Sequence, residues 1–465
     1  MKINEQNNKK GFQESTLNAR QIAVRILTRI EKEGAYANLL LRSYLAGLDD
    51  GRERNLTTAL VYGVLKNKLL LDYVLRKHLT KPMSALPVEV RQVLRTAALQ
   101  ILFMDKIPAP IAINEAVNTV KYFHKSYAAL VNKILRQTAE TGWNFNWPDK
   151  TKEPLRYLAV KYSHHEWLVK RWLKRFGLEE TEELLAANNT PSDTCIRVNT
   201  LKITSTELIQ KLEERGIEAV KSSKLPDALY IKNYGALEDL DLFREGYFTV
   251  QDASSQLAAY LLNPQAGERV LDVCSAPGGK TTYFAQLMDN SGEIVAVDIY
   301  PQKLELVNQL AGRLGINIIK TIQTDARELE QIQGQFDKVL VDAPCSGLGV
   351  LRRRADLRWQ KREDEIQKLP ELQLAILLSA AEKVAPGGEL LYSTCTTEPE
   401  ENFEVAKAFR RERPDFSAVD LSEALPFKVT EERDLRQLKK GVWQILPHLH
   451  DMDGFFIAKM KRKAD

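Results

Sequence analysis

The sequence predicts a multidomain fold in three parts: an all-α bundle, a small α+β module, and an α/β domain with a parallel, doubly wound sheet. Three observations lead to this prediction. Apolar residues recur at helical spacing from about residue 17 to 137, short strands mix with helices between 155 and 245, and strand–loop–helix units repeat from Arg269 onward. We expect the three domains to span 1–145, 150–245 and 246–465.

The N-terminal part has the periodicity of amphipathic helices, as in Ile22, Ile26, Leu27 and Ile30. Gly34, a turn at 49–51 and several prolines interrupt the pattern, which predicts several helices of ordinary length. The stretch 141–153 has no periodicity and is interpreted as a linker.

Segments of the second and third parts match strands or helices. In the middle module, 195–199 and 228–232 alternate like strands, and 205–215 has helical spacing. In the last part, RVLDVC, EIVAVD, IIKTIQ, DKVLVD and ELLYSTC are predicted to be buried strands, and a helix is expected from Pro301 to Leu314.

Composition excludes several classes of protein. The 465 residues are 44% hydrophobic and 28% charged, as in an ordinary globular protein. No apolar run of about 18 residues occurs, and the start MKINEQNNKKGFQE lacks the apolar core of a signal peptide, so we expect a cytoplasmic protein without a membrane segment. The four cysteines show neither disulfide nor zinc spacing, so no metal is expected.

Positive charge is concentrated at the N-terminal end. Residues 1–150 carry 23 Lys and Arg against 13 Asp and Glu, whereas the remaining residues carry 43 against 49. This asymmetry indicates where a polyanion would dock.

A glycine-containing loop, residues 272–280 (DVCSAPGGK), follows a predicted strand and opens a helix. Such a loop lets the backbone approach a nucleotide-like ligand closely, although a plain strand-to-helix turn is the alternative. The pattern GxGxxG is absent, which argues against a nicotinamide coenzyme.

Three aspartates are predicted at the carboxyl ends of successive strands. Asp298 comes 19 residues after Gly279, Asp325 follows the third strand, and Asp342 ends the fourth. Each alone fits a helix cap or a turn, but together with the loop they predict a ligand crevice at this edge, with Asp298 near ribose hydroxyls.

Two cysteines follow strands at the same edge, Cys345 in DAPCSG and Cys395 in YSTCT. A thiolate that adds to carbon 6 of a cytosine makes carbon 5 able to take a methyl group, and Asp342 is placed to assist near ring nitrogen 3. The alternative for each cysteine is a small buried apolar side chain, which we expect for Cys195 and Cys274.

Several segments resemble the motifs of one family, in its order and spacing: CSAPGGKTT, DAPCSGLGVLRRRADLRW, LLYSTCTTEPEEN and HLHDMDGFF. They are similar to the bacterial Sun/Fmu-type 16S rRNA cytosine methyltransferases of the Nol1/Nop2/Sun family. The first 140 residues, including NARQIAVRILTRIE and AINEAVNTVK, resemble the antitermination factor NusB. The resemblance implies a NusB-like RNA-binding bundle, a module similar to RNA-recognition folds, and a Rossmann-like class I methyltransferase domain.

The resemblance also implies the cofactor and the site. The cofactor is S-adenosylmethionine, with Asp298 at its ribose and Asp325 at its adenine. Cys395 is implied as the nucleophile, Cys345 as the group that assists product release, and Asp342 and Lys280 as groups facing the base. The residues implied in cofactor binding are Cys274, Ser275, Ala276, Pro277, Gly278, Gly279, Lys280, Asp298, Asp325 and Asp342.

The expected reaction is methylation of carbon 5 of a cytosine in 16S rRNA, through a covalent cysteine adduct. The resemblance implies nucleotide 967 as the target, and we expect a monomer that acts on free rRNA or on an immature small subunit. Methylation of tRNA by the same chemistry and a non-catalytic RNA-binding scaffold are the alternatives.

Further segments suggest RNA contacts. The arginine row 352–354 would suit phosphates, although a solvated charge run is the alternative. The stretch 161–176 interleaves aromatic and basic residues, a pattern that core packing also explains. His448 and His450 form an incomplete metal site, so we expect packing or RNA contact.

Overall fold

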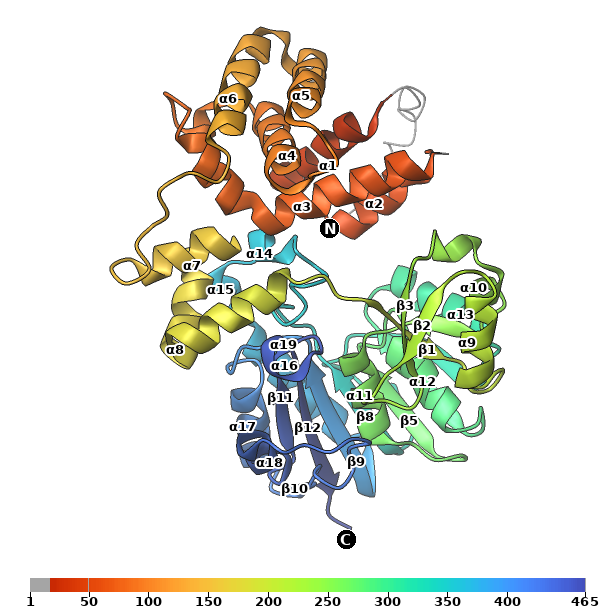
Figure 1. The fold of residues 1–465 in the computed structure, drawn as a ribbon. Coiled ribbons are helices and arrows are strands. Elements are labelled where there is room, and N and C mark those ends of the chain that lie inside the picture. Colours follow the sequence, from red (N-terminus) through yellow and green to blue (C-terminus); the bar gives the residue numbers. More distant parts are fainter. Residues whose placement is uncertain (1–16, 49, 465) are drawn as a thin grey trace. The chain divides into compact units, whose positions relative to one another are not determined.

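The computed structural model describes residues 17–48 and 50–464 (Figure 1). The chain divides into two compact units: one holds the residues up to Asn189 together with Arg354–Gln360, and the other holds residues 190–353 and 361 onward. The N-terminal stretch 1–16 and residue 49 of the expected turn lie outside the described residues. The domain boundaries expected from the sequence stay a prediction.

The first unit consists of helices, as its periodicity predicts. Helix α1 begins with a capping box, in which the Asn18 side chain accepts from Gln21 N at 3.0 Å, and it ends at Gly34 with a φ of 64°. Its helices are α1 (Ala19–Glu33), α2 (Ala37–Leu45), α3 (Gly51–Arg76), α4 (Val88–Phe103), α5 (Ala109–His124), α6 (Ala128–Thr141), α7 (Pro154–Tyr162), α8 (Glu166–Asn189) and the short α14 (Leu357–Gln360), with 3-10 turns at Met83–Ala85 and Lys125–Tyr127.

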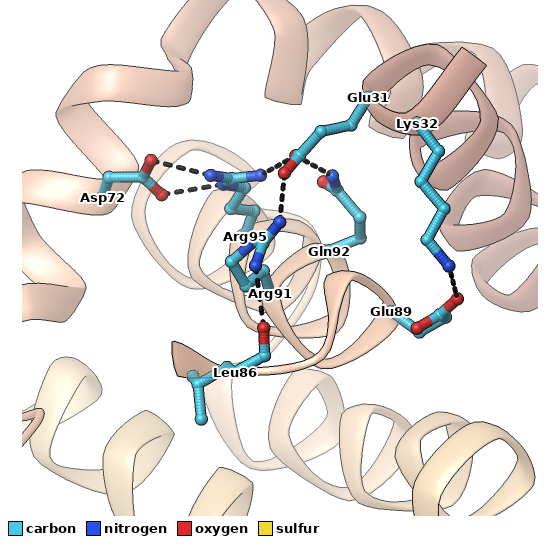
Figure 2. Close-up of polar contacts among 8 residues, drawn as sticks. All are labelled: Glu31, Lys32, Asp72, Leu86, Glu89, Arg91, Gln92 and Arg95. Atoms are coloured by element: carbon cyan, nitrogen blue, oxygen red, sulfur yellow. Dashed lines mark hydrogen bonds and ion pairs between the residues drawn. The ribbon is translucent and has the colours of Figure 1, made fainter. Parts of the chain in front are cut away.

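A cluster of charged side chains links α1, α3 and α4 inside this unit (Figure 2). The Glu31 carboxylate accepts from Arg91, from Gln92 at 2.7 Å and from Arg95 at 2.7 Å. Arg95, whose side chain is only 5% exposed, also pairs with both oxygens of Asp72 at 2.7 and 2.8 Å. Each carboxylate thus has cationic partners, which offsets the cost of removing it from water.

The segment 354–360 packs into the helical unit although it follows the cysteine loop of the α/β domain in sequence. The buried Arg358 guanidinium donates to the Ser163 carbonyl at 3.2 Å and to Asn189 Oδ1 at 2.8 Å. Trp359 Nε1 donates to the Leu65 carbonyl at 2.7 Å. Backbone and amide oxygens hold the Arg358 guanidinium in place, and burial lowers its pKa to about 9.

The second unit begins with a four-stranded antiparallel sheet in the order β2-β3-β1-β4. Cys195 is fully buried in this module, as expected. The elements are β1 (Thr194–Val198), α9 (Ser205–Glu213), β2 (Glu218–Lys221), β3 (Ala228–Lys232), a 3-10 turn at Leu237–Asp239, α10 (Asp241–Arg244) and β4 (Phe248–Val250).

The rest of the unit is built on an eight-stranded sheet in the order β10-β12-β9-β8-β5-β6-β7, with β11 paired to β12. Strands β5 to β9 are parallel, and β12 runs antiparallel beside β9. The strands are β5 (Arg269–Val273), β6 (Glu293–Asp298), β7 (Ile319–Gln323), β8 (Phe336–Asp342), β9 (Val384–Thr394), β10 (Phe416–Ala418), β11 (Val442–Ile445) and β12 (Phe455–Arg462). The helices are α11 (Ala253–Leu262), α12 (Gly279–Leu287), α13 (Pro301–Leu314), α15 (Glu363–Ile366), α16 (Leu369–Ala381), α17 (Phe403–Glu412), α18 (Glu432–Leu438) and α19 (Pro447–His450).

Alternating residues of the central strands are buried on opposite faces of this sheet. Leu340 and Leu391 pack with residues of α11 and α12, whereas Val341 and Tyr392 pack with residues of α16 and α17. Both faces are therefore covered by helices, which confirms the predicted α/β domain. Among the described residues, no helix has the length and apolar character needed to span a membrane.

The charged cluster in the helical unit generates a prediction about acid stability. Burial opposes ionisation of Glu31, but Arg95 and Arg91 outweigh it and lower the pKa of the carboxyl to about 2. Because the pKa of an unfolded glutamate is about 4.3, the charge contributes stability that is present above that pH and is lost as the pH falls toward 2. We expect Glu31→Gln to destabilise the protein by about 2 kcal/mol at pH 7.

The measurement is calorimetric unfolding at pH 7 and pH 3, with Glu33→Gln as the control on the same helix. Glu33 forms an exposed i,i+4 pair with Arg29 at 3.0 Å, so its removal should change stability by a few tenths of a kcal/mol. The difference between wild type and Glu31→Gln should shrink at pH 3. An equal difference at both pH values would contradict this account.

Candidate active site

Two cysteine side chains meet at the carboxyl edge of the sheet. β8 ends at Asp342 and β9 at Thr394, and the parallel register places Asp342 opposite Ser393. The loops that follow these strands bring the Sγ atoms of Cys345 and Cys395 to 3.2 Å. Both cysteines are partly exposed.

The environment of Cys345 disfavours its thiolate. Its contact with the Cys395 sulfur, its burial and the nearby Glu401 and Asp342 carboxylates together hold the pKa of Cys345 well above the usual value for a thiol. Cys345 therefore keeps its proton at neutral pH.

An ion pair lies at the same edge. Lys280 Nζ donates to Asp342 Oδ2 at 2.6 Å, and Ser393 Oγ donates to the other Asp342 oxygen at 2.8 Å. The ammonium also lies 5.3 Å from the centre of the Phe455 ring. Burial opposes the charge on Lys280, but Asp342 outweighs it and raises the pKa of the ammonium above its usual value. A fixed positive charge thus orients the Asp342 carboxylate.

The glycine loop after β5 has backbone conformations that favour small residues. Gly278, which precedes α12, has a φ of 99°, and a Cβ atom there would lie 3.2 Å from the Val307 Cα. Cys274 also has a positive φ, 67°. The loop therefore brings the start of α12 close to the strand edge, as a nucleotide-like ligand requires.

This loop borders a cavity of about 110 Å³. Asp272, in its wall, accepts from Thr281 Oγ1 at 2.6 Å, while its second carboxylate oxygen is buried and has no hydrogen-bond partner among the described residues. Burial raises the pKa of Asp272 to about 7. An unpaired carboxylate oxygen beside a glycine turn fits S-adenosylmethionine, which carries an ammonium group and a cationic sulfur. The lining residues are Gln251, Ser255, Asp272, Cys274, Ser275, Ala276, Pro277, Gly279, Lys280 and Asp342.

Three expected cofactor residues are not among those lining the cavity: Gly278, Asp298 and Asp325. Asp298 ends β6 and accepts from Tyr300 N at 3.0 Å. Asp325 pairs with Arg327 at 2.6 Å. Their contacts with ribose and adenine stay predictions.

Sequence reasoning missed residues that support the loop. Arg197, on β1, is buried and donates to the Gly279 carbonyl at 2.6 Å, to Thr282 Oγ1 at 3.0 Å and to the Gln251 side chain. It therefore fixes the first turn of α12. In the sequence, Arg197 stands between apolar residues of a predicted strand. A charged residue at such a position is rarely buried without a partner, so it indicated a structural contact.

The arginine row 352–354 does not present an open surface to phosphates, because its members have carboxylate partners. Arg353 lies between Asp252 at 2.7 Å and Asp453 at 2.8 Å, and Arg352 lies 3.5 Å from Asp451. These pairs tie the cysteine loop to neighbouring loops.

The stretch 161–176 is mainly structural. Trp172 is only 1% exposed, so its ring is unavailable for stacking on RNA bases, and the Tyr162 hydroxyl donates to Glu182 at 2.9 Å. His450 packs as expected, with Nε2 at 3.0 Å from Asp434. In the described part of the chain, no group of three or more His, Cys, Asp or Glu residues is placed to hold a metal ion.

Family models match three successive parts of the chain. Residues 259–461 match the 16S rRNA methyltransferase RsmB/F, and residues 17–140 match the NusB family. Residues 164–238 match the ferredoxin-like domain of RsmF/B-like methyltransferases. The NusB-like bundle and the small α+β module expected from the sequence are confirmed.

Curated relatives match almost the whole chain. The probable ribosomal RNA small subunit methyltransferase B of Bacillus subtilis is 40% identical over 451 residues, which cover 96% of this chain and 99% of the relative. A protein of the same name from Synechocystis is 34% identical, with 96% of this chain and 100% of the relative covered.

Two solved structures have a fold similar to that of this chain. The crystal structure of PH0851 has a TM-score of 0.79 at 31% identity and covers 96% of this chain and 99% of that chain. NSun6 from Pyrococcus horikoshii, solved with SFG, has a TM-score of 0.57 at 27% identity and covers 64% of this chain and 98% of that chain. The chain belongs to the RsmB/F family of 16S rRNA methyltransferases and is an enzyme that uses S-adenosylmethionine.

Proposed function

We propose that this rRNA methyltransferase transfers its methyl group to carbon 5 of a cytosine, through a covalent adduct between Cys395 and carbon 6. One observation carries the proposal: the two sulfur atoms lie 3.2 Å apart at the edge that also holds the Lys280–Asp342 pair. Carbon 5 of cytosine is a weak nucleophile until a thiolate adds to carbon 6, and the site combines a thiol with charged groups for that purpose.

The first step forms a bond between the Cys395 sulfur and carbon 6, which leaves carbon 5 electron-rich. The Asp342 carboxylate, held by Lys280 and Ser393, accepts a hydrogen bond from the exocyclic amine, and from nitrogen 3 once that atom is protonated, and so assists the addition. Bound S-adenosylmethionine supplies the methyl group.

In the last step a water molecule takes the proton from carbon 5, and the electron pair of that bond forms the double bond between carbons 5 and 6. The bond between sulfur and carbon 6 breaks at the same time, and Cys395 leaves as a thiolate. Cys345, at 3.2 Å from the Cys395 sulfur, assists this release. Because Cys345 stays protonated at neutral pH, it does not compete with Cys395 in the first step. The two thiols therefore have separate roles.

The substrate in this proposal is 16S rRNA, free or in an immature small subunit, and the resemblance of the sequence motifs implies nucleotide 967 as the target. The NusB-like bundle binds the RNA, because its excess of basic residues attracts the phosphates. An unpaired loop spares the enzyme the few kcal/mol that extrusion of a stacked base costs. We propose a monomer that acts in the cytoplasm.

The test is transfer from tritiated S-adenosylmethionine to a 16S rRNA fragment, with a transcribed tRNA as the second substrate and adducts resolved on a denaturing gel. Cys395→Ala should abolish both transfer and adduct, because no thiolate adds to carbon 6. Cys345→Ala should accumulate a protein–RNA adduct, because release fails. An adduct that requires Cys345 would reverse the assignment, and transfer to tRNA alone would replace the proposed substrate.

Asp342→Asn should reduce turnover at saturating substrates by about 10²-fold or more, because the target cytosine loses its contact with a charged carboxylate. The matched control is Asp364→Asn, which breaks only an exposed pair with Arg362 at 3.3 Å. Steady-state kinetics with both variants would detect the difference. Equal turnover in Asp342→Asn and the control would remove Asp342 from the mechanism.

A further inference from the structure

A buried glutamate lies beneath the two cysteine loops. Glu401, between β9 and α17, is 0% exposed. One of its oxygens accepts from Ser346 N at 2.8 Å and from Gln373 Nε2 at 3.0 Å. The other accepts from Ser346 Oγ at 2.5 Å and from Thr396 Oγ1 at 3.2 Å. Ser346 directly follows Cys345 and Thr396 directly follows Cys395, so one carboxylate contacts both loops.

The loops are further joined around this carboxylate. The Ser346 and Thr396 hydroxyls lie 2.7 Å apart, and Gln373 also donates to the Pro344 carbonyl at 3.0 Å. The neighbouring Asn402 accepts from Thr394 Oγ1 at 2.5 Å and donates to the Thr396 carbonyl at 3.0 Å. The residues on both sides of each cysteine are therefore tied to one polar network.

The chemistry of Glu401 differs from that of an ordinary buried ion pair. In the described part of the chain, the Glu401 carboxylate accepts from an amide, a backbone N–H and two hydroxyls, and none of these donors carries a charge. Burial raises the pKa of Glu401, and the hydrogen bonds from Ser346, Gln373 and Thr396 only partly offset that shift. A neutral glutamine at this place would turn its NH2 group toward two of these donors. The site thus retains a carboxylate, which accepts hydrogen bonds at both oxygens although its burial costs free energy.

We propose that Glu401 is a positioning residue, which sets the distance between Cys345 and Cys395 by hydrogen-bonding the residue that follows each of them. The inference deepens the proposed function and rests on its two-thiol mechanism. The charge of Glu401 also contributes to the raised pKa of Cys345, which keeps that thiol protonated while Cys395 reacts. No contact with RNA or S-adenosylmethionine is required of it.

The first experiment compares Glu401→Gln with Glu404→Gln, the same change at an exposed position of α17. We expect the kcat of Glu401→Gln to fall by about 10²-fold, since displacement of reacting groups by about 1 Å has that effect. The KM values for RNA and S-adenosylmethionine should stay within twofold of wild type, because the binding surfaces are unchanged. An unchanged kcat, or a rise in KM alone, would overturn the proposal.

The second experiment measures the thiol distance without any methyl transfer. Glutathione disulfide oxidises two nearby thiols to a disulfide and is reduced to two glutathione molecules. Mass spectrometry of the RNA-free protein should show that the Cys345–Cys395 crosslink forms several-fold more slowly in Glu401→Gln than in wild type and Glu404→Gln. Equal crosslinking rates would overturn the proposal, whereas slower crosslinking without carbon-5 methylation would reject only the proposed function.

A variant pair covers the case in which Glu401→Gln fails to fold. Ser346→Ala and Thr396→Val each remove one hydroxyl from the network and leave the carboxylate with its backbone partner. If the two loops are joined through Glu401, the effects of these changes on kcat and on crosslinking should be non-additive in the double variant. Additive effects would show that the loops are independent and would contradict the proposal.

Discussion

The site depends on the pairing of β8 with β9. Their parallel register places Asp342 opposite Ser393, and the loops that follow bring two sulfur atoms to 3.2 Å. A slip of one residue in β8 would turn Asp342 to the other face, and a slip in either strand would change the distance between the thiols. The register is strongly specified, because Leu340 and Leu391 face one buried layer and Val341 and Tyr392 face the other.

The charged groups of the site are stabilised by hydrogen bonds and ion pairs within the protein rather than by solvent. Lys280 and Ser393 fix Asp342, and neutral donors surround Glu401. Arg197 reaches from the small antiparallel sheet to the Gly279 carbonyl at the start of α12. Because each of these groups is costly to bury, their partners leave them few alternative positions. Such preorganisation suits a reaction in which a thiol must stay close to one atom of a base.

The order of helices and strands along the chain could be predicted, because it depends on the spacing of apolar residues within short segments. Helical spacing marked the bundle, and the apolar runs RVLDVC, EIVAVD and DKVLVD marked the strands β5, β6 and β8. Placing chemistry-bearing residues at strand ends then predicted that Cys345 and Cys395 share an edge. The edge strands β10 and β11 are short and lack a strong pattern, so the sequence did not reveal them.

Partners distant in sequence could not be predicted. The arginine row looked free in the sequence, but Arg353 lies between Asp252 and Asp453, about a hundred residues away on either side. The network of Glu401 joins residues 55 positions apart, and no local periodicity reports such a contact. Segment 354–360 belongs to the helical unit for the same reason: buried donors such as Arg358 find carbonyl acceptors there.

In the proposed reaction the methyl group enters at carbon 5 of a cytosine. The most direct measurement uses 16S rRNA transcribed with cytidine that carries tritium at carbon 5, and it follows release of tritium to water together with methyl transfer. The account predicts one tritium atom released for each methyl group transferred, since the carbon-5 proton must leave before Cys395 does. Methyl transfer with tritium retained in the RNA would contradict it, because the methyl group would then lie elsewhere on the nucleotide.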